Sequence, residues 1–163
     1  MNGWPYDLNQ LAGQAGPGDG DGRPDDVWND CGPTSVAAVL GWAFGQAVEP
    51  DAIRDALYGD GRKGYTYMAD LYRYLGGVGL RATLVTETSG ADQWVQSAIR
   101  AGGPVLALTK EPAGYNHICP YTGFDEVSVV RHQVLGGGRE VLTWPDFLGR
   151  FAGWLIVVVP PGP

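Results

Sequence analysis

The sequence has little cysteine, little positive charge and no long apolar run. Its two cysteines, Cys31 and Cys119, can form at most one disulfide, which excludes a disulfide-stapled scaffold. Eleven Lys and Arg residues against eighteen Asp and Glu residues give a net charge of -7. This excess of acid argues against binding to nucleic acid or to an anionic membrane surface. The longest apolar run, 154–160, has the length of a strand and is too short to span a membrane.

The N-terminal residues also lack the basic and apolar regions of a secretory signal peptide, so we expect synthesis in a cytoplasm. A chain of 163 residues supports one hydrophobic core. We therefore expect a single domain over 1–160, with a glycine-rich and acidic lead-in over 1–30. The proline-rich residues 161–163 resemble the start of a stiff linker, which predicts further domains beyond it. A monomer is expected.

Helical periodicity dominates the first half of the chain and strand patterns the second half. Helices are predicted over 33–44, 50–58, 66–75, 91–101 and 144–151, the third capped by Thr66 and the last by Thr143. Strands are predicted over 81–87, 104–109, 117–124, 127–134 and 154–159. Pro120 cannot donate to a strand ladder, so a bulge or an unpaired edge is expected there. The order predicts an α+β fold with a mostly antiparallel sheet.

Cys31 stands at the start of the first predicted helix, in the run Asn-Asp-Cys-Gly-Pro-Thr-Ser. The unpaired N–H groups and the positive dipole end of a helix N-terminus stabilise a thiolate and lower the pKa of its thiol. Cys31 is therefore a candidate nucleophile; the alternative is a buried structural cysteine.

A thiolate nucleophile needs a base, and the chain has two histidines, His117 and His132. His117 is the better candidate, because it opens a predicted strand directly after the loop 112–116, where substrate can enter. A packed histidine without a catalytic role is the alternative.

These residues resemble a family of enzymes. Three motifs carry the resemblance: the Cys31 box, the segment Tyr115-Asn116-His117 that opens a strand ending in Tyr-Thr-Gly-Phe-Asp, and the run Trp-Pro-Asp-Phe at 144–147. Together they look like the papain-like cysteine peptidases of the bacteriocin-leader-peptidase type. The resemblance implies the papain-like fold, with the nucleophile at a helix start packed on a C-terminal sheet. It implies hydrolysis of a peptide substrate by Cys31 and His117 without a cofactor.

The resemblance also implies a glutamine that joins the Cys31 N–H in an oxyanion hole. Asp25 stands six residues before Cys31, where such a glutamine is often found, which is a departure. We assign the role to Gln10, with 11–28 as an inserted loop; Gln14 and Asn29 are the substitutes.

A second departure concerns the acid that normally orients the histidine ring. A two-residue turn at 125–126 pairs His117 with Val134 and places His132 on the face of His117. His132 is therefore the candidate for the orienting position. Gln133 takes over if the turn holds one more residue or Pro120 forces a bulge. Neither residue is an acid, and a neutral side chain stabilises the imidazolium less than a carboxylate does. Slow turnover and a catalytically silent homologue therefore remain alternative hypotheses.

Two further features are assigned structural roles. Cys119 is expected on the strand face that meets the nucleophile helix, opposite His132, as buried core. The acidic loop 19–26 partly resembles a calcium loop, but Pro17 and Trp28 stand where its first and last ligands belong. A solvated loop without metal is favoured.

The favoured function is a peptidoglycan endopeptidase domain of a phage endolysin, acting on the cell wall, although the acidic chain would be repelled by an anionic wall. The long segment between Gln10 and Cys31 favours it over the alternative, a leader peptidase of a bacteriocin exporter. A catalytically silent peptide-binding module and an acyl transferase with the same dyad are the other hypotheses.

Overall fold

The computed structural model describes residues 31–59, 66–87, 89–135 and 137–163. These residues form the helices α1 (Cys31–Phe44), α2 (Pro50–Tyr58), α3 (Met68–Gly77), α4 (Ala91–Arg100) and α5 (Trp144–Arg150). They also form the strands β1 (Ala82–Val85), β2 (Val105–Lys110), β3 (Asn116–Phe124), β4 (Ser128–His132), β5 (Arg139–Thr143) and β6 (Phe151–Val158).

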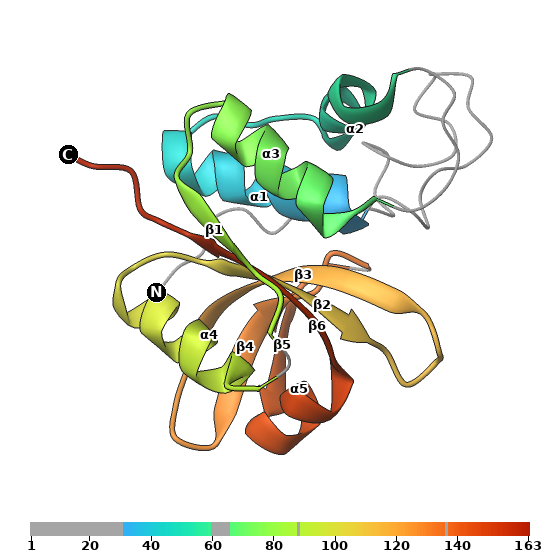
Figure 1. Ribbon diagram of the computed structural model, residues 1–163, viewed down its shortest axis with the longest axis vertical. Helices are drawn as coiled ribbons and strands as arrows, with labels where there is room; N and C mark the ends of the chain where they lie inside the picture. The colour runs from blue at the N-terminus through green and yellow to red at the C-terminus, as the bar shows by residue number, and fades with distance from the viewer. Residues whose placement is uncertain (1–30, 60–65, 88, 136) are drawn as a thin grey trace.

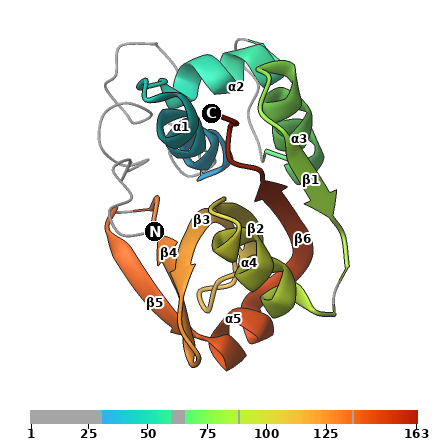
Figure 2. The same ribbon diagram turned by 90° about the vertical axis from the view of Figure 1, so that its left-hand side faces the viewer.

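All six strands belong to one antiparallel sheet with the order β1-β6-β2-β3-β4-β5. Helices α1, α2 and α3 lie together on one side of it, and α4 and α5 lie on the other (Figures 1 and 2). This confirms the α+β prediction. Within the described ranges, no helix is long and apolar enough to cross a membrane.

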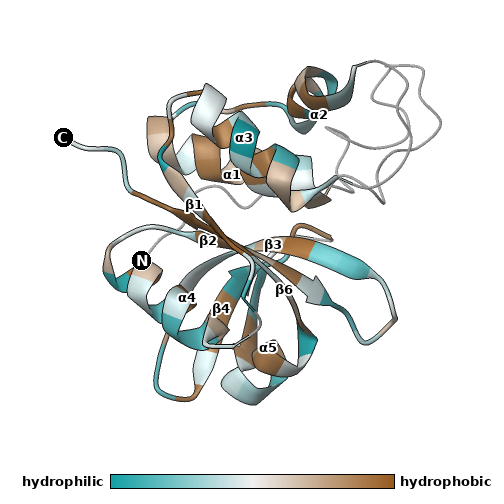
Figure 3. Ribbon diagram, in the orientation of Figure 1, coloured by the Kyte–Doolittle hydropathy of each residue, from teal (hydrophilic) through white to brown (hydrophobic). Residues whose placement is uncertain are grey.

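The alternation of side chains along the strands divides the core into two layers. Leu106, Ile118 and Ile156 face α1, α2 and α3, whereas their strand neighbours Ala107 and Cys119 belong to the cluster beneath α4 and α5. Figure 3 shows the hydrophobic colour concentrated on α1 and the strands beneath it. Because α1 is buried on nearly every side from Gly32 to Gly41, it is the central helix of its layer.

Most predicted elements occur within a few residues of their expected bounds, with three local differences. The helix α1 begins at Cys31 itself rather than at residue 33. The N-cap of α3 is Tyr67, which makes no side-chain capping bond, so the prediction for Thr66 is wrong. Thr143 does cap α5, since its hydroxyl accepts a hydrogen bond of 3.2 Å from the Asp146 N–H.

The strand β5 was not predicted, because it is a five-residue edge strand with a single buried side chain, Leu142. It pairs with β4 over its full length, from Ser128 opposite Thr143 to His132 opposite Arg139. This pairing brings Glu140 to the end of β4, beside the candidate site described below.

Candidate active site

Cys31 is the first residue of α1 and is partly exposed, as its assignment as a nucleophile requires. The backbone N–H groups of the first helical turn point toward this end of α1, where they favour a negative charge. The two cysteines, both within the described residues, are not joined by a disulfide.

Gly32 explains why α1 can begin so close to α3. A Cβ at this position would lie 3.0 Å from the Thr66 Cβ and 3.1 Å from the Leu71 Cδ1. A side chain at this position would therefore force Thr66 or Leu71 to give way by a few tenths of an ångström, next to Cys31.

Ser35 fixes α1 to the strand that carries His117. One helical turn after Cys31, the Ser35 hydroxyl donates a buried hydrogen bond of 2.9 Å to the backbone carbonyl of Ile118, the residue that follows His117. Among the described hydrophobic residues, only Cys31 packs against both core clusters, the one containing Ile118 and the one containing Cys119. Cys31 thus lies where the helical layer meets the sheet at β3.

His117 is 2% exposed at the start of β3. Its Nε2 lies 2.5 Å from the Gln133 Oε1, and the ring meets the edge of Tyr115 at a centroid distance of 5.9 Å. Burial lowers the pKa of His117 below its ordinary value. The Gln133 hydrogen bond and the nearby Glu111 carboxylate favour the charged ring and so act in the opposite direction.

The Gln133 amide is oriented by two partners whose roles are fixed. Its Oε1 accepts a hydrogen bond of 3.2 Å from the Leu135 N–H, and its Nε2 donates one of 3.3 Å to the Glu140 carboxylate. The oxygen therefore points at His117, which must carry a proton on Nε2. The other nitrogen, Nδ1, is left with the lone pair that a general base needs.

The predicted register of the β3–β4 hairpin is wrong, and with it the placement of His132. Phe124 pairs with Val129 across a longer turn, and the register then shifts between Tyr121 and Gly123. His132 consequently lies 2.8 Å from the Thr122 hydroxyl. Gln133, the stated alternative, is the residue that contacts His117. The irregularity follows Pro120 along the strand. A proline favours such a bulge because it has no backbone N–H to donate to the ladder.

Cys119 is 1% exposed, as expected of a core residue, but the face predicted for it is wrong. It belongs to the cluster beneath α4 and α5, whereas Ile118 faces α1. Its thiol lies 3.5 Å from the Gln133 Oε1. Burial raises the pKa of Cys119 to about 12, and the nearby Cys31 acts in the same direction.

An ionic network centred on the buried pair Arg131 and Glu111, which the sequence did not reveal, supports this corner of the sheet. Arg131, 1% exposed, donates to the carboxylates of Glu111 and Glu140, and Arg150 donates to the second oxygen of Glu111 at 3.0 Å. Burial alone would raise the pKa of Glu111, but the hydrogen bond and charge of Arg131, with His117 and Arg150, hold it below the ordinary value. These residues come from four separate segments, so no local spacing could indicate their meeting.

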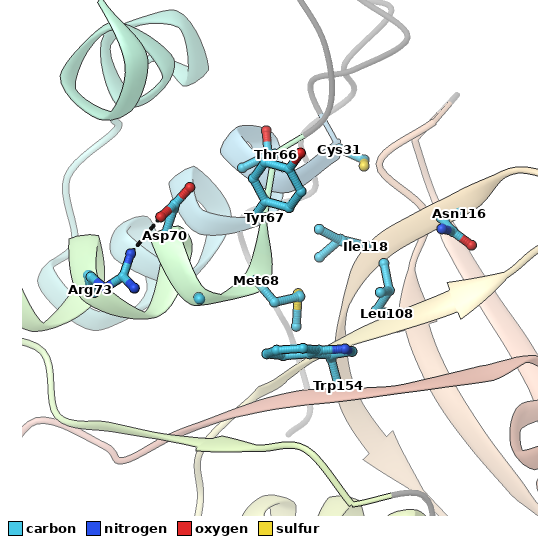
Figure 4. A pocket seen from close by; sticks show the side chains of 11 residues that line it. Cys31, Thr66, Tyr67, Met68, Asp70, Arg73, Leu108, Asn116, Ile118 and Trp154 are labelled. Atoms are coloured by element: carbon cyan, nitrogen blue, oxygen red, sulfur yellow. Dashed lines mark hydrogen bonds and ion pairs between the residues drawn. The ribbon is translucent and has the colours of Figure 1, made fainter.

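A mostly apolar pocket of about 490 Å³ opens beside Cys31 (Figure 4). It is lined by Cys31, Thr66, Tyr67, Met68, Ala69, Asp70, Arg73, Leu108, Asn116, Ile118 and Trp154. Trp154 lies across one side, and Asp70 and Arg73 form an ion pair of 2.7 Å at the far end from Cys31. The pocket therefore offers an apolar surface that leads to the thiol.

Several predicted features fall outside the described residues. They are Gln10, its substitutes Gln14 and Asn29, and the acidic loop 19–26. Among the residues that are described, no group of three His, Cys, Asp or Glu side chains could hold a metal ion.

Comparison with solved structures decides the fold. The peptidase domain of Streptococcus ComA, a bi-functional ABC transporter of a quorum-sensing pathway, matches 96% of this chain and 99% of its own, with a TM-score of 0.63 and 14% identity. The fold is that of these exporter peptidase domains. A double-glycine motif protease from an AMS/PCAT transporter, in complex with its leader peptide, matches 81% of this chain and 85% of its own, with a TM-score of 0.59 and 19% identity.

The Streptococcus mutans ComA peptidase domain matches 81% of this chain and 93% of its own, with a TM-score of 0.52 and 12% identity. No protein-family model and no curated protein sequence matches the chain. The comparisons confirm the papain-like peptidase fold implied by the residues around Cys31 and His117.

Proposed function

We propose that this protein is a cysteine peptidase that processes leader peptides of the double-glycine type. The observation that carries the proposal is the site within this fold: a thiol at the start of α1, a helix that Ser35 bonds to the strand carrying a buried histidine whose Nε2 is held by Gln133. A neighbouring structure with the same fold holds a leader peptide.

The chemistry follows from the tautomer of His117. Its Nδ1 takes the proton of Cys31, and the thiolate attacks the carbonyl carbon of the scissile peptide bond. The imidazolium returns this proton to the leaving amine, which leaves a thioester on Cys31. Water then cleaves the thioester with His117 again acting as base, and releases a carboxylic acid. The Cys31 N–H and Gln10 are the proposed donors to the oxyanion.

The pocket beside Cys31 supports a peptide substrate that presents apolar side chains outside its Gly-Gly pair. Met68, Leu108 and Trp154 give it an apolar wall, and Asn116 adds a polar group on the strand that carries His117. Apolar lining with few polar groups is typical of sites that bind by burying side chains.

The endolysin hypothesis has less support. The solved structures named above are peptidase domains of transporters, and the net charge of -7 disfavours approach to an anionic cell wall. Leader processing, the stated alternative, is therefore the better assignment.

One observation favours a second candidate, a module that binds peptides without cleaving them. Gln133 occupies the position where the resemblance expects a carboxylate, and a neutral amide stabilises an imidazolium less than a carboxylate does. Turnover is the property that separates the two functions.

The test is to incubate the protein with a synthetic leader peptide that ends in Gly-Gly, followed by a short cargo segment. We expect mass spectrometry to detect cleavage after the second glycine by the wild type, and none by Cys31→Ala or His117→Ala. A peptide with both glycines replaced by valine is the matched substrate control. Binding without cleavage would establish the silent module, and release of peptides from purified peptidoglycan alone would restore the endolysin hypothesis.

A further inference from the structure

The His117 site lacks an acid in direct contact, but a carboxylate lies one residue further along the hydrogen-bonded chain. His117 Nε2 contacts Gln133 Oε1 at 2.5 Å, and Gln133 Nε2 donates to Glu140 Oε2 at 3.3 Å. Glu140 reaches this position only because the edge strand β5 pairs with β4, with Glu140 opposite Arg131.

We propose that Glu140 is the positioning residue that supplies the missing negative charge of the triad, acting on His117 through the Gln133 amide. An amide that donates to a carboxylate is polarised, so its oxygen becomes a stronger acceptor for the His117 N–H. The same contact prevents the amide from flipping. Glu140 therefore acts on both the tautomer of His117 and the stability of its imidazolium. The catalytic consequence of this inference rests on the proposed function, whereas the effect of Glu140 on His117 through Gln133 does not.

Arg131 opposes part of this effect, because its Nε donates at 2.7 Å to the same Glu140 oxygen, Oε2, that accepts from the Gln133 amide. Its terminal NH1 donates to Glu111, so its positive charge is shared between two carboxylates, and both of these favour the charged His117 ring. Arg131 and Glu111 fix the Glu140 carboxylate, whose side chain is otherwise 37% exposed. The role of Arg131 is thus to hold Glu140 in place beside Gln133.

The charged and titratable groups around His117 come from every adjoining element. They are Cys31 on α1, Glu111 and Tyr115 between β2 and β3, Cys119 on β3, Arg131 on β4 and Glu140 on β5. Glu111 and Glu140 favour the charged ring and Arg131 opposes it. Of the two carboxylates, only Glu140 is hydrogen-bonded to the amide that contacts His117.

The primary test measures His117 itself, without using peptidase activity. In a Cys31→Ala background, the ring of His117 is titrated by NMR in three proteins: the parent, E140Q and the swapped pair Q133E/E140Q. We expect the pKa of His117 to fall in E140Q and to rise above that of the parent in the swapped pair, where the carboxylate contacts the ring directly. The matched control is E126Q, which removes an equal charge at the opposite end of β4.

The catalytic consequence is measured with Cys31 present. At pH 6, the rate of Cys31 alkylation by iodoacetamide should fall about three- to tenfold in E140Q and remain unchanged in E126Q, because less of the thiolate–imidazolium pair is present. The swapped pair should recover the rate, which a purely structural role for Glu140 would not produce.

Identical titrations of His117 in the parent and E140Q would overturn the proposal, as would a swapped pair that titrates like E140Q. These outcomes are independent of leader-peptide cleavage. A protein that shows the NMR shifts but cleaves no peptide contradicts the proposed function and leaves the role of Glu140 intact.

Discussion

At the scale of single residues, the site depends on which side chain meets His117. A one-residue difference in register moves the choice from His132 to Gln133, because side chains alternate across a strand. Gln133 contacts the His117 ring, whereas His132 contacts Thr122. The two neighbours therefore have separable roles.

Substitution of Gln133 by Ala should lower kcat/KM for leader-peptide cleavage by at least about tenfold, because the ring loses the acceptor that fixes its tautomer. His132→Asn should leave kcat/KM within about twofold of the wild type while lowering the stability by about 1 kcal/mol through the altered Thr122 hydrogen bond. Steady-state kinetics and chemical denaturation measure the two effects. A larger loss of kcat/KM in His132→Asn than in Gln133→Ala would contradict the assignment.

The two cysteines should differ sharply in reactivity. Cys31 is partly exposed at a helix start, whereas burial raises the pKa of Cys119 to about 12. Iodoacetamide at pH 7 should therefore modify Cys31 and leave Cys119 unmodified in the folded protein. Peptide mapping by mass spectrometry checks this, with labelling in denaturant as the control that Cys119 can react. Equal labelling of both thiols in the folded protein would be inconsistent with these environments.

At the scale of elements, the helix that carries Cys31 is fixed to the strand that carries His117 by one buried hydrogen bond. Ser35→Ala leaves the Ile118 carbonyl without its donor. We expect a loss of about 1–2 kcal/mol in the free energy of unfolding and a several-fold lower kcat/KM, because α1 is less firmly held against β3.

The adjacent Thr34 provides a matched control. Its buried hydroxyl has no hydrogen-bond partner among the described residues, so Thr34→Val removes a hydroxyl from the same helical turn without removing a bond. This variant should be as stable as the wild type in denaturant unfolding, or more so. If both variants lost equal stability, the Ser35 bond would not be the cause.

The sequence predicted the elements well because their signals are local. The Cys-Gly-Pro run marked the start of α1, and Pro50 and Thr143 marked the starts of α2 and α5. Turn length and the bulge after Pro120 determine the register of β3 and β4, and neither is encoded by a pattern of period two. The residues around Gln133 depend on that register, so Glu140 and Arg131 could not be assigned from spacing.

At the scale of the whole molecule, the site lies between two layers that are built from different halves of the chain. The helical layer contributes Cys31, and the sheet contributes His117, Gln133 and the charged residues behind them. The proposed catalysis therefore requires the whole fold, and conditions that weaken the fold would also separate the proposed nucleophile from its proposed base.

Acidification should destabilise the fold in two successive steps. Burial holds the pKa of His117 below its ordinary value of 6.5, so below pH 6.5 the unfolded chain binds a proton that the folded chain does not. The free energy of unfolding must then decrease as the pH falls from 6.5. The pKa of Glu111 is also held below its ordinary value of 4.5, so its contribution is present above pH 4.5 and is lost as the pH falls further.

Urea denaturation at intervals between pH 7.5 and pH 3.5 separates the two steps. The wild type should lose stability in both windows, whereas His117→Gln should show little loss between pH 7 and pH 5 and retain the loss below pH 4.5. A constant dependence of the unfolding free energy on urea concentration would show that the same surface is exposed throughout. Parallel curves for the two proteins between pH 7 and pH 5 would mean that His117 is not held neutral by the fold.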